Sequence, residues 1–224
     1  MDSKLEIKRK DWDNQVMKTE DLSHQVCRTV DEKEWEFLAQ DVLTKLSVNG
    51  KSESILDVGC GNALLLNFLK PHFNSLYGTD FSQRMVDAAA KLIPDGNFKQ
   101  GEANAIAYPD HHFDRVLSYS IFHYFPSDEY AFEAVKEMMR VCKKGGKILI
   151  GDLLDKKFEE QIKGASDKEY ETKIPLIQRY SEWLFVDLDL LLKKTEAAGG
   201  RATVLAQPAG FKLAHYRKDL LIEV

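Results

Sequence analysis

The sequence contains few cysteines, no long apolar run and no excess of basic residues. Its three cysteines, Cys27, Cys60 and Cys142, lack the paired spacing of a disulfide framework or a zinc site. No apolar stretch reaches the roughly 20 residues of a membrane-spanning helix, and the polar N-terminal segment differs from a signal peptide. We therefore expect a cytoplasmic protein in a reducing compartment, with no bound metal and no membrane partner.

The net charge and the length of the chain limit its possible partners and its number of domains. The formal net charge is −5 over 224 residues, whereas nucleic-acid binding usually requires a basic face. This balance predicts no nucleic-acid partner, although it leaves a local basic patch open. The length suffices for one α/β domain with a single core. We expect residues 1–224 to form one domain, as a monomer or a homodimer.

The chain is organised around its first glycine-rich stretch. The apolar run at 55–58 predicts a buried strand, Gly59 and Gly61 indicate a tight turn, and residues 63–69 predict a helix. A strand, a glycine turn and a helix place backbone N–H groups and a helix N-terminus against a ligand. A dinucleotide-binding fingerprint would have a third glycine where Leu64 stands, so the pattern disfavours a nicotinamide cofactor.

The second predicted strand ends in an acid. Residues 75–80 form this strand, and Asp80 lies 21 residues after Gly59. At that distance an acid at a strand end can accept hydrogen bonds from both hydroxyls of a ribose. Ser82 is placed to cap the following helix. Asp80 is therefore predicted to bind a ligand.

The residues Ile-Leu-Asp-Val-Gly-Cys-Gly-Asn, at positions 55–62, resemble the cofactor-binding motif of class I S-adenosylmethionine-dependent methyltransferases. That family usually has glycine where Ala63 stands, a difference expected to tighten the pocket beneath the methionine end. The resemblance implies an α/β, Rossmann-like fold, with a seven-stranded, mostly parallel sheet, an antiparallel C-terminal hairpin and helices on both faces. It implies S-adenosylmethionine as cofactor and S-adenosylhomocysteine as product, bound by a core at residues 54–152.

Later segments match the same family in order. Phe81 and Met85 match residues that flank the adenine, although core packing is an alternative for Met85. Glu102 and Ala103 resemble the family's Gly-Asp-Ala segment, which meets the adenine, and a solvated loop acid is the alternative for Glu102. The backbone of Ser118 matches the position that receives the cofactor's amino group. The cofactor-binding residues that the resemblance implies are Asp57, Gly59, Cys60, Gly61, Asp80, Phe81, Met85, Glu102, Ala103, Ser118 and Trp12.

Two interpretations fit the N-terminal segment. Residues 1–28 are polar and could form a partly disordered arm. Alternatively, Asp11-Trp12-Asp13 resembles a segment that many small-molecule members fold over the cofactor, where Trp12 would gain cation–π attraction from the sulfonium. Residues 1–46 would then form a lid, ending in a helix that is predicted at 31–46 by its capping residues and apolar spacing.

The catalytic candidates follow strands four and five. His123 lies just beyond a strand predicted at 113–119 and has the pKa range of a general base. A His that only packs or caps beneath the cofactor is the alternative. Asp152 follows a strand predicted at 147–151 and is a second base candidate, with a hydrogen-bonding loop acid as the alternative.

Residues 153–186 are predicted to recognise the acceptor, because family members carry that segment between strand five and the next helix. Tyr180 and Trp183 could wall a substrate pocket, although aromatics at this spacing are as often core. A helix is predicted at 187–198, before two final strands.

These features favour transfer of a methyl group from S-adenosylmethionine to an oxygen or nitrogen of a small molecule. A sugar or a nucleotide-linked sugar is one acceptor class within the breadth of the family. The alternatives are a non-catalytic S-adenosylmethionine-binding subunit or sensor and, on a related sheet, a nicotinamide dehydrogenase.

Overall fold

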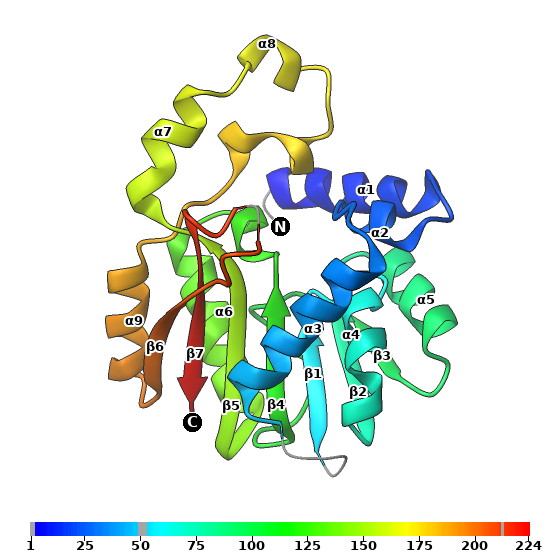
Figure 1. Cartoon of the computed structure of the whole chain (residues 1–224), viewed down its shortest axis with the longest axis vertical. Coiled ribbons are helices and arrows are strands. Elements are labelled where there is room, and N and C mark those ends of the chain that lie inside the picture. The colour runs from blue at the N-terminus through cyan, green and yellow to red at the C-terminus, as the bar shows by residue number, and fades with distance from the viewer. Residues whose placement is uncertain (1–2, 49–52, 212) are drawn as a thin grey trace.

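One seven-stranded sheet runs through the molecule. The structure, a computed structural model, describes residues 3–48, 53–211 and 213–224. The strands are β1 (Ser54–Val58), β2 (Ser75–Asp80), β3 (Asn97–Gln100), β4 (Phe113–Tyr119), β5 (Cys142–Leu154), β6 (Arg201–Ala206) and β7 (Arg217–Glu223). Their order across the sheet is β3-β2-β1-β4-β5-β7-β6 (Figure 1). Strands β1 to β5 pair in parallel, and β7 pairs antiparallel with β5 and β6, which confirms the predicted fold class.

Helices cover both faces of the sheet. The α-helices are α1 (Ser3–Met17), α2 (Leu22–Gln25), α3 (Glu32–Leu46), α4 (Leu64–Leu69), α5 (Gln83–Leu92), α6 (Asp128–Val141), α7 (Glu159–Gly164), α8 (Lys168–Glu171) and α9 (Leu188–Ala197). Ile55 and Leu117 pack with α3, α4 and α5, whereas their neighbours Leu56 and Val116 pack with α6 and α9. This alternation follows from the two-residue period of a strand. The central strands are therefore buried on both faces, as in most parallel sheets.

The predicted helix caps lie where the sequence indicates them. Asp31 and Glu34 form the capping box of α3. The Ser82 side chain accepts a hydrogen bond at the start of α5, as predicted. Asp187, which was not predicted as a cap, does the same for α9.

The N-terminal segment is helical rather than disordered, so the expectation of a disordered arm is wrong for α1 and α2. Figure 1 shows that these helices and the segment 156–182 lie over the edge at which the parallel strands end. The Oδ2 atom of Asp11 accepts a hydrogen bond from the Leu176 backbone N–H at 2.6 Å. This bond joins α1 to a segment that is distant in the sequence.

Strand β5 is longer than the predicted strand at 147–151. Cys142 at its start pairs with Phe113, and its far end pairs with β7. The pairing with β7 shifts register between Ile150 and Leu153. Asp152 therefore lies within an irregular part of the strand. The sequence had predicted that it follows the end of the strand.

Between β5 and α9 the chain forms short elements. Besides α7 and α8, these are the 3₁₀ turns η3 (Lys156–Phe158), η4 (Leu176–Gln178) and η5 (Tyr180–Glu182); two further turns, η1 (Lys70–His72) and η2 (Phe122–Tyr124), lie earlier in the chain. Within the described ranges, no helix combines the length and apolarity needed to cross a membrane.

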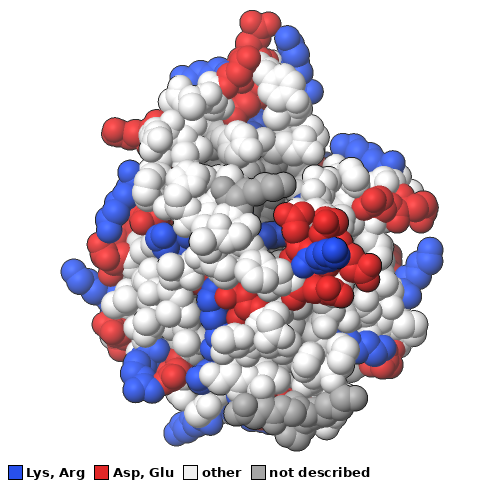
Figure 2. Space-filling model, in the orientation of Figure 1, with Lys and Arg blue, Asp and Glu red and all other residues white. Residues whose placement is uncertain are grey.

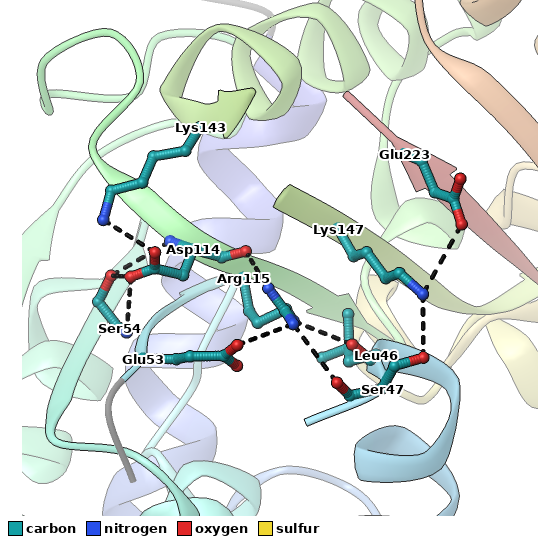
Figure 3. A network of polar contacts seen from close by, with 9 residues as sticks. All are labelled: Leu46, Ser47, Glu53, Ser54, Asp114, Arg115, Lys143, Lys147 and Glu223. Carbon is teal, nitrogen blue, oxygen red and sulfur yellow. Dashed lines mark hydrogen bonds and ion pairs between the residues drawn. The ribbon is translucent and has the colours of Figure 1, made fainter. Parts of the chain in front are cut away.

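A polar network closes the edge at which the parallel strands begin (Figure 3). Arg115 pairs with Glu53, with 2.9 Å between Nη2 and Oε1. Asp114 accepts hydrogen bonds from the Ser54 backbone N–H at 3.0 Å and from Lys143 Nζ at 2.9 Å. These paired charges connect β1, β4 and β5 at the edge opposite to the one that α1 covers.

Candidate active site

A cavity of about 710 Å³ lies at the carboxyl edge of the sheet. Its walls come from the N-terminal segment, the glycine turn after β1, the ends of β2 and β4, and residues within 177–183, 207–211 and 213–217. In open parallel sheets this edge is where ligands bind, because the loops that follow the strands converge there.

The glycine turn has the backbone geometry that the sequence predicts. Gly59 and Gly61 have φ values of 78° and 53°, which glycine adopts without strain. A Cβ atom on Gly59 would lie 2.6 Å from the Ile121 side chain, so a larger residue does not fit. Cys60 also lines the cavity, and burial raises the pKa of its thiol well above the usual range. The turn thus presents close-packed backbone to a ligand.

Ala63 does not have the predicted effect on the cavity. It is fully buried, packs beside α3 and α4, and does not contribute to the cavity wall. Its φ of 62° lies in the left-handed region, which explains why glycine would suit this position.

Asp80 ends β2 beside the glycine turn, where it was predicted. Its Oδ2 atom accepts a hydrogen bond from the Gly61 N–H at 2.9 Å, and its Oδ1 atom accepts one from the Ser82 N–H at 2.9 Å. Burial raises the pKa of Asp80 to about 6, although these two bonds oppose the shift. A carboxylate has about four lone-pair sites, so both oxygens retain capacity for the hydroxyls of a ribose.

Asp57 lies deeper in the same wall. It is 3% exposed, lines the cavity, and its Oδ1 atom has no hydrogen-bond partner. Burial, with the nearby charge of Asp80, raises the pKa of Asp57 to about 8. A cation bound at this point would supply the missing partner and favour the ionised form.

The expected adenine end is only partly assembled as predicted. Phe81, Met85 and Ala103 line the cavity. Glu102 does not; its Oε2 atom accepts a hydrogen bond from the Tyr130 hydroxyl at 3.4 Å. The assignment of Glu102 to the adenine therefore lacks support, because the side chain is turned toward α6.

The expected contact between the Ser118 backbone and the cofactor's amino group stays a prediction. Ser118 is fully buried, and its hydroxyl donates to the Val58 carbonyl at 2.9 Å. The cavity wall begins one residue later, at Tyr119 and Ser120. Ser118 thus connects β4 to β1 and does not line the cavity.

Trp12 lines the cavity from α1, as the lid interpretation predicts. Its ring meets the Tyr124 ring edge-on, with 5.4 Å between centroids. It packs in one apolar cluster with Met85 and Ile177, which joins α1, α5 and η4.

His123 lies in η2 and faces the cavity. It is 3% exposed, and its Nδ1 atom has no hydrogen-bond partner. Burial, and next the positive charge of Arg217, lower the pKa of His123 to about 3. The imidazole is therefore neutral at physiological pH, but it is a weak base.

Asp152 belongs to an ionic cluster that crosses three elements. Its φ is 67°, and its Oδ2 atom accepts hydrogen bonds from the Ser120 hydroxyl and Arg217 Nη1. Arg28 Nη1 lies 3.7 Å from the same oxygen. Burial raises the pKa of this carboxyl, but Arg217 and Arg28 outweigh that effect and hold it at about 2. Asp152 is a permanent anion in a salt bridge, which disfavours its predicted role as a base.

Sequence reasoning missed Arg28 and Arg217, which come from opposite ends of the chain and meet only in the fold. Asn62 belongs to the motif at 55–62 but was assigned no role; its amide donates to the Leu22 carbonyl and to Gln25 Oε1, both at 2.9 Å. These bonds hold α2 against the glycine turn. Among the described residues, no group of three or more His, Cys, Asp or Glu side chains could hold a metal ion.

The cavity fits a cofactor with a ribose and a cationic amino acid end. Asp80 has free acceptor capacity beside the turn, and the unpartnered Asp57 oxygen calls for a donor. Gly59 and Gly61 line the cavity, so the backbone of the glycine turn faces the space that a cofactor would occupy. S-adenosylmethionine carries these groups, so the residues present are consistent with it.

Residues 56–150 match the family described as "Methyltransferase domain". Over 113 residues the chain is 33% identical to phosphatidylethanolamine N-methyltransferase of Cereibacter sphaeroides. The matched region covers 48% of this chain and 54% of that protein. The chain thus spans about half the length of this curated relative.

Solved structures share the fold over almost the whole chain. A chain from a Haloferax volcanii complex that contains the Trm112 methyltransferase activator has a TM-score of 0.69 at 15% identity, covering 95% of this chain and 97% of that chain. A SAM-dependent methyltransferase from Aquifex aeolicus has a TM-score of 0.60 at 19% identity, with 99% and 98% covered. Residues 56–150 thus match a methyltransferase family, and the chain shares its fold with SAM-dependent methyltransferases, which supports the predicted resemblance and S-adenosylmethionine as cofactor.

Proposed function

We propose that this chain transfers a methyl group from S-adenosylmethionine to a nitrogen or oxygen of a small molecule. The observation that carries the proposal is that one cavity is lined both by Asp57 and Asp80, which lie beside the glycine turn, and by His123, Tyr180 and Trp183. A cofactor and an acceptor could therefore lie next to each other.

Each end of the cofactor has a matching group. Asp80 would accept the ribose hydroxyls and Asp57 the methionine ammonium, while Phe81 and Met85 would contact the adenine. Arg28 would pair with the methionine carboxylate, because the 26–28 segment lies against the glycine turn: Val26 is 3.1 Å from where a Cβ on Gly61 would stand.

Positioning is the main contribution that the chain itself would make. When bound, the cofactor supplies a methyl group on a sulfonium, which is a good leaving group. Aligning an acceptor with that methyl can contribute about 7–11 kcal/mol in favourable cases. We assign residues 1–46 to covering the cofactor and residues 153–186 to recognising the acceptor. Trp12, Tyr124 and Trp183 would exclude water from the reacting atoms.

The electrostatics favour an acceptor that needs no strong base. The pKa of His123, about 3, and that of Asp152, about 2, are both too low for efficient proton removal near neutral pH. An amine nitrogen, which attacks through its lone pair, or an oxygen that is already ionised suits this site. The name of the Cereibacter sphaeroides relative also indicates a nitrogen acceptor.

A small acceptor agrees better with the surface than a nucleic acid does. Figure 2 shows acidic and basic side chains intermixed on this face, without a continuous basic surface among the residues that it colours. The formal net charge of −5 points the same way.

Calorimetric titration with S-adenosylhomocysteine, with NAD as the control, tests the first half of the proposal. Micromolar binding of S-adenosylhomocysteine alone is the expected result. A screen with labelled methyl donor against small amines, alcohols and carboxylates then tests transfer. Tight cofactor binding without transfer to any acceptor, together with a stable protein partner, would favour a non-catalytic subunit instead.

A further inference from the structure

The opening of the cavity is bordered by apolar side chains that remain exposed. Phe37 of α3 is 46% exposed, Tyr180 of η5 is 44% exposed and Leu213 is 38% exposed, and all three line the cavity. We call these three residues the apolar rim. Single exposed apolar residues are ordinary on a protein surface, whereas apolar residues grouped at one opening are typical of a ligand-binding groove.

Phe37 stands out on its own helix. The other exposed residues of α3 are polar, whereas the apolar residues of this helix face the core. The Phe37 ring meets the Phe211 ring edge-on, with 5.3 Å between centroids, and a Cβ atom on Gly210 would lie 3.2 Å from its Cε1 atom. These contacts hold the ring against the chain before β7 and still leave almost half of Phe37 in water. A ligand that covered this surface would gain from its burial.

The apolar surface continues from the rim into the cavity. On one side Leu38 and the partly buried Phe211 line the cavity and pack in one apolar cluster. On the other side the Tyr180 ring lies 4.4 Å from the Trp183 ring, centroid to centroid, and Trp183 lies 4.7 Å from the His123 ring. Apolar and aromatic side chains therefore extend from the outside to the rings beside which the acceptor is placed in the function proposed above.

The charged side chains of the cavity have partners within the protein. Arg217 donates to Asp152, and Arg28 Nη1 lies 3.7 Å from the same carboxylate oxygen. Glu34 also lines the cavity, and its Oε2 atom accepts a hydrogen bond from the Asp31 N–H at 3.3 Å in the capping box of α3. The rim, in contrast, leaves much of its apolar surface to a ligand.

We propose that the acceptor carries an alkyl chain, which leaves the cavity across the apolar rim while its polar head lies beside His123 and Trp183. The cavity measures about 710 Å³ and must also hold the cofactor, so a chain of more than a few carbons has to pass through the opening. This inference rests on the proposed methyltransferase function, since it extends the acceptor site to the surface. The formal net charge of −5 disfavours a different use of the rim, docking on an anionic membrane.

The test measures binding of 1-butanol, 1-hexanol and 1-octanol to the full chain saturated with S-adenosylhomocysteine. These probes are neutral and share a head group, so differences in Kd report on the chain alone. Each buried CH₂ group should tighten binding about three- to fourfold, and octanol should therefore bind at least about tenfold more tightly than butanol. Equal affinity for the three alcohols, or no binding of octanol up to its solubility limit, would overturn the proposal.

Variants locate the effect at the rim. In Phe37→Ser/Leu213→Ser the preference for octanol over butanol should fall to about threefold or less, because the rim then offers two hydroxyl groups. Leu190→Ser is the matched control, since Leu190 of α9 is 43% exposed and does not line the cavity; it should keep the wild-type preference. If the double variant does not fold, Leu213→Ser alone should lose part of the preference. A wild-type preference in a folded rim variant would overturn the proposal.

Two further measurements separate the alternatives. If the protein floats with phosphatidylcholine vesicles through Phe37 and Leu213 while the alcohols show no dependence on chain length, the rim docks on a bilayer and the assignment to an acceptor chain is wrong. If wild-type protein does not bind S-adenosylhomocysteine, the proposed function itself has failed, and this is visible before any alcohol is added.

Discussion

Binding of S-adenosylhomocysteine should tighten as the pH rises, because Asp57 must ionise to meet the methionine ammonium. In the ligand-free protein burial and Asp80 raise the pKa of Asp57 to about 8, and its Oδ1 atom lacks a partner. At pH 7 about nine-tenths of this carboxyl is therefore protonated. The bound ammonium favours the charged form, so each pH unit below 8 should weaken binding by about 1.4 kcal/mol, a factor of about ten in Kd.

Calorimetry at pH 6.5, 7.0 and 7.5 measures this effect above the pKa of Asp80, which is about 6. Titrations in two buffers with different protonation enthalpies should reveal release of roughly 0.9 protons at pH 7. Asp57→Asn, which cannot ionise, should abolish both the proton release and the pH dependence. Asp87→Asn changes an exposed residue of α5 and should behave like wild type. A constant Kd without proton release, or the same release in Asp57→Asn, would refute the placement of the ammonium at Asp57.

Three further predictions concern single residues. Asp80→Ala should raise the Kd for S-adenosylhomocysteine by at least about tenfold, since it removes a charged acceptor whose hydrogen bonds to the ribose hydroxyls contribute about 1.5–3 kcal/mol each. Calorimetry with Asp87→Ala as the control checks this. Unchanged affinity in a folded Asp80→Ala variant would show that the ribose does not bind at this site. Ala63→Gly should destabilise the protein by about 1–2 kcal/mol less than Ala89→Gly does, as measured by urea denaturation. Both residues are fully buried, but Ala63 has a φ of 62°, which glycine adopts more easily, whereas Ala89 lies within α5. Equal losses of stability would contradict this. Because the pKa of His123 is about 3, the pH profile of kcat should show no inflection near pH 6.5 that depends on His123. An inflection near pH 6.5 that is present in the wild type and absent in His123→Asn would restore His123 as a general base.

The predictable parts of this chain are those with local signals. Gly59 and Gly61, followed by Asp80 at the next strand end, are recognisable because a turn and a strand end need specific residue types at fixed spacing. The capping box of Asp31 and Glu34 has the same property. In each case the structure depends on neighbours within a few residues or on one strand–helix repeat.

Helix α1 escaped prediction because distant residues hold it in place. Its sequence lacks a clear apolar face, and its buried side chains include the polar Lys8 and Gln15. Lys8 donates to the Tyr124 carbonyl and Asp11 accepts from the Leu176 N–H, contacts that span more than a hundred residues. A sequence pattern cannot reveal partners at that separation.

The ionic cluster of Asp152 could not be predicted from the sequence either. Its direct partner Arg217 lies 65 residues away, and Asp152 reaches it because β5 is irregular between Ile150 and Leu153. An irregularity of this kind redirects a side chain without leaving a strong sequence signal. Asp152 could thus be singled out as an acid near the active edge, but its role as a salt-bridged anion required the fold.

Two aspartates on adjacent central strands illustrate how the edges of the sheet differ. At the amino edge Asp114 is partly buried, which raises its pKa, but Lys143 and Ser54 outweigh this and lower the pKa overall. At the carboxyl edge Asp57 has no comparable partner, and its pKa rises to about 8. Burying a carboxyl without a hydrogen-bond or charge partner opposes folding. Asp57 therefore lowers the free energy of unfolding of the ligand-free protein, whereas Asp114 does not. A cationic ligand that supplies the missing interaction recovers this free energy as binding affinity, which makes the incomplete edge the functional one.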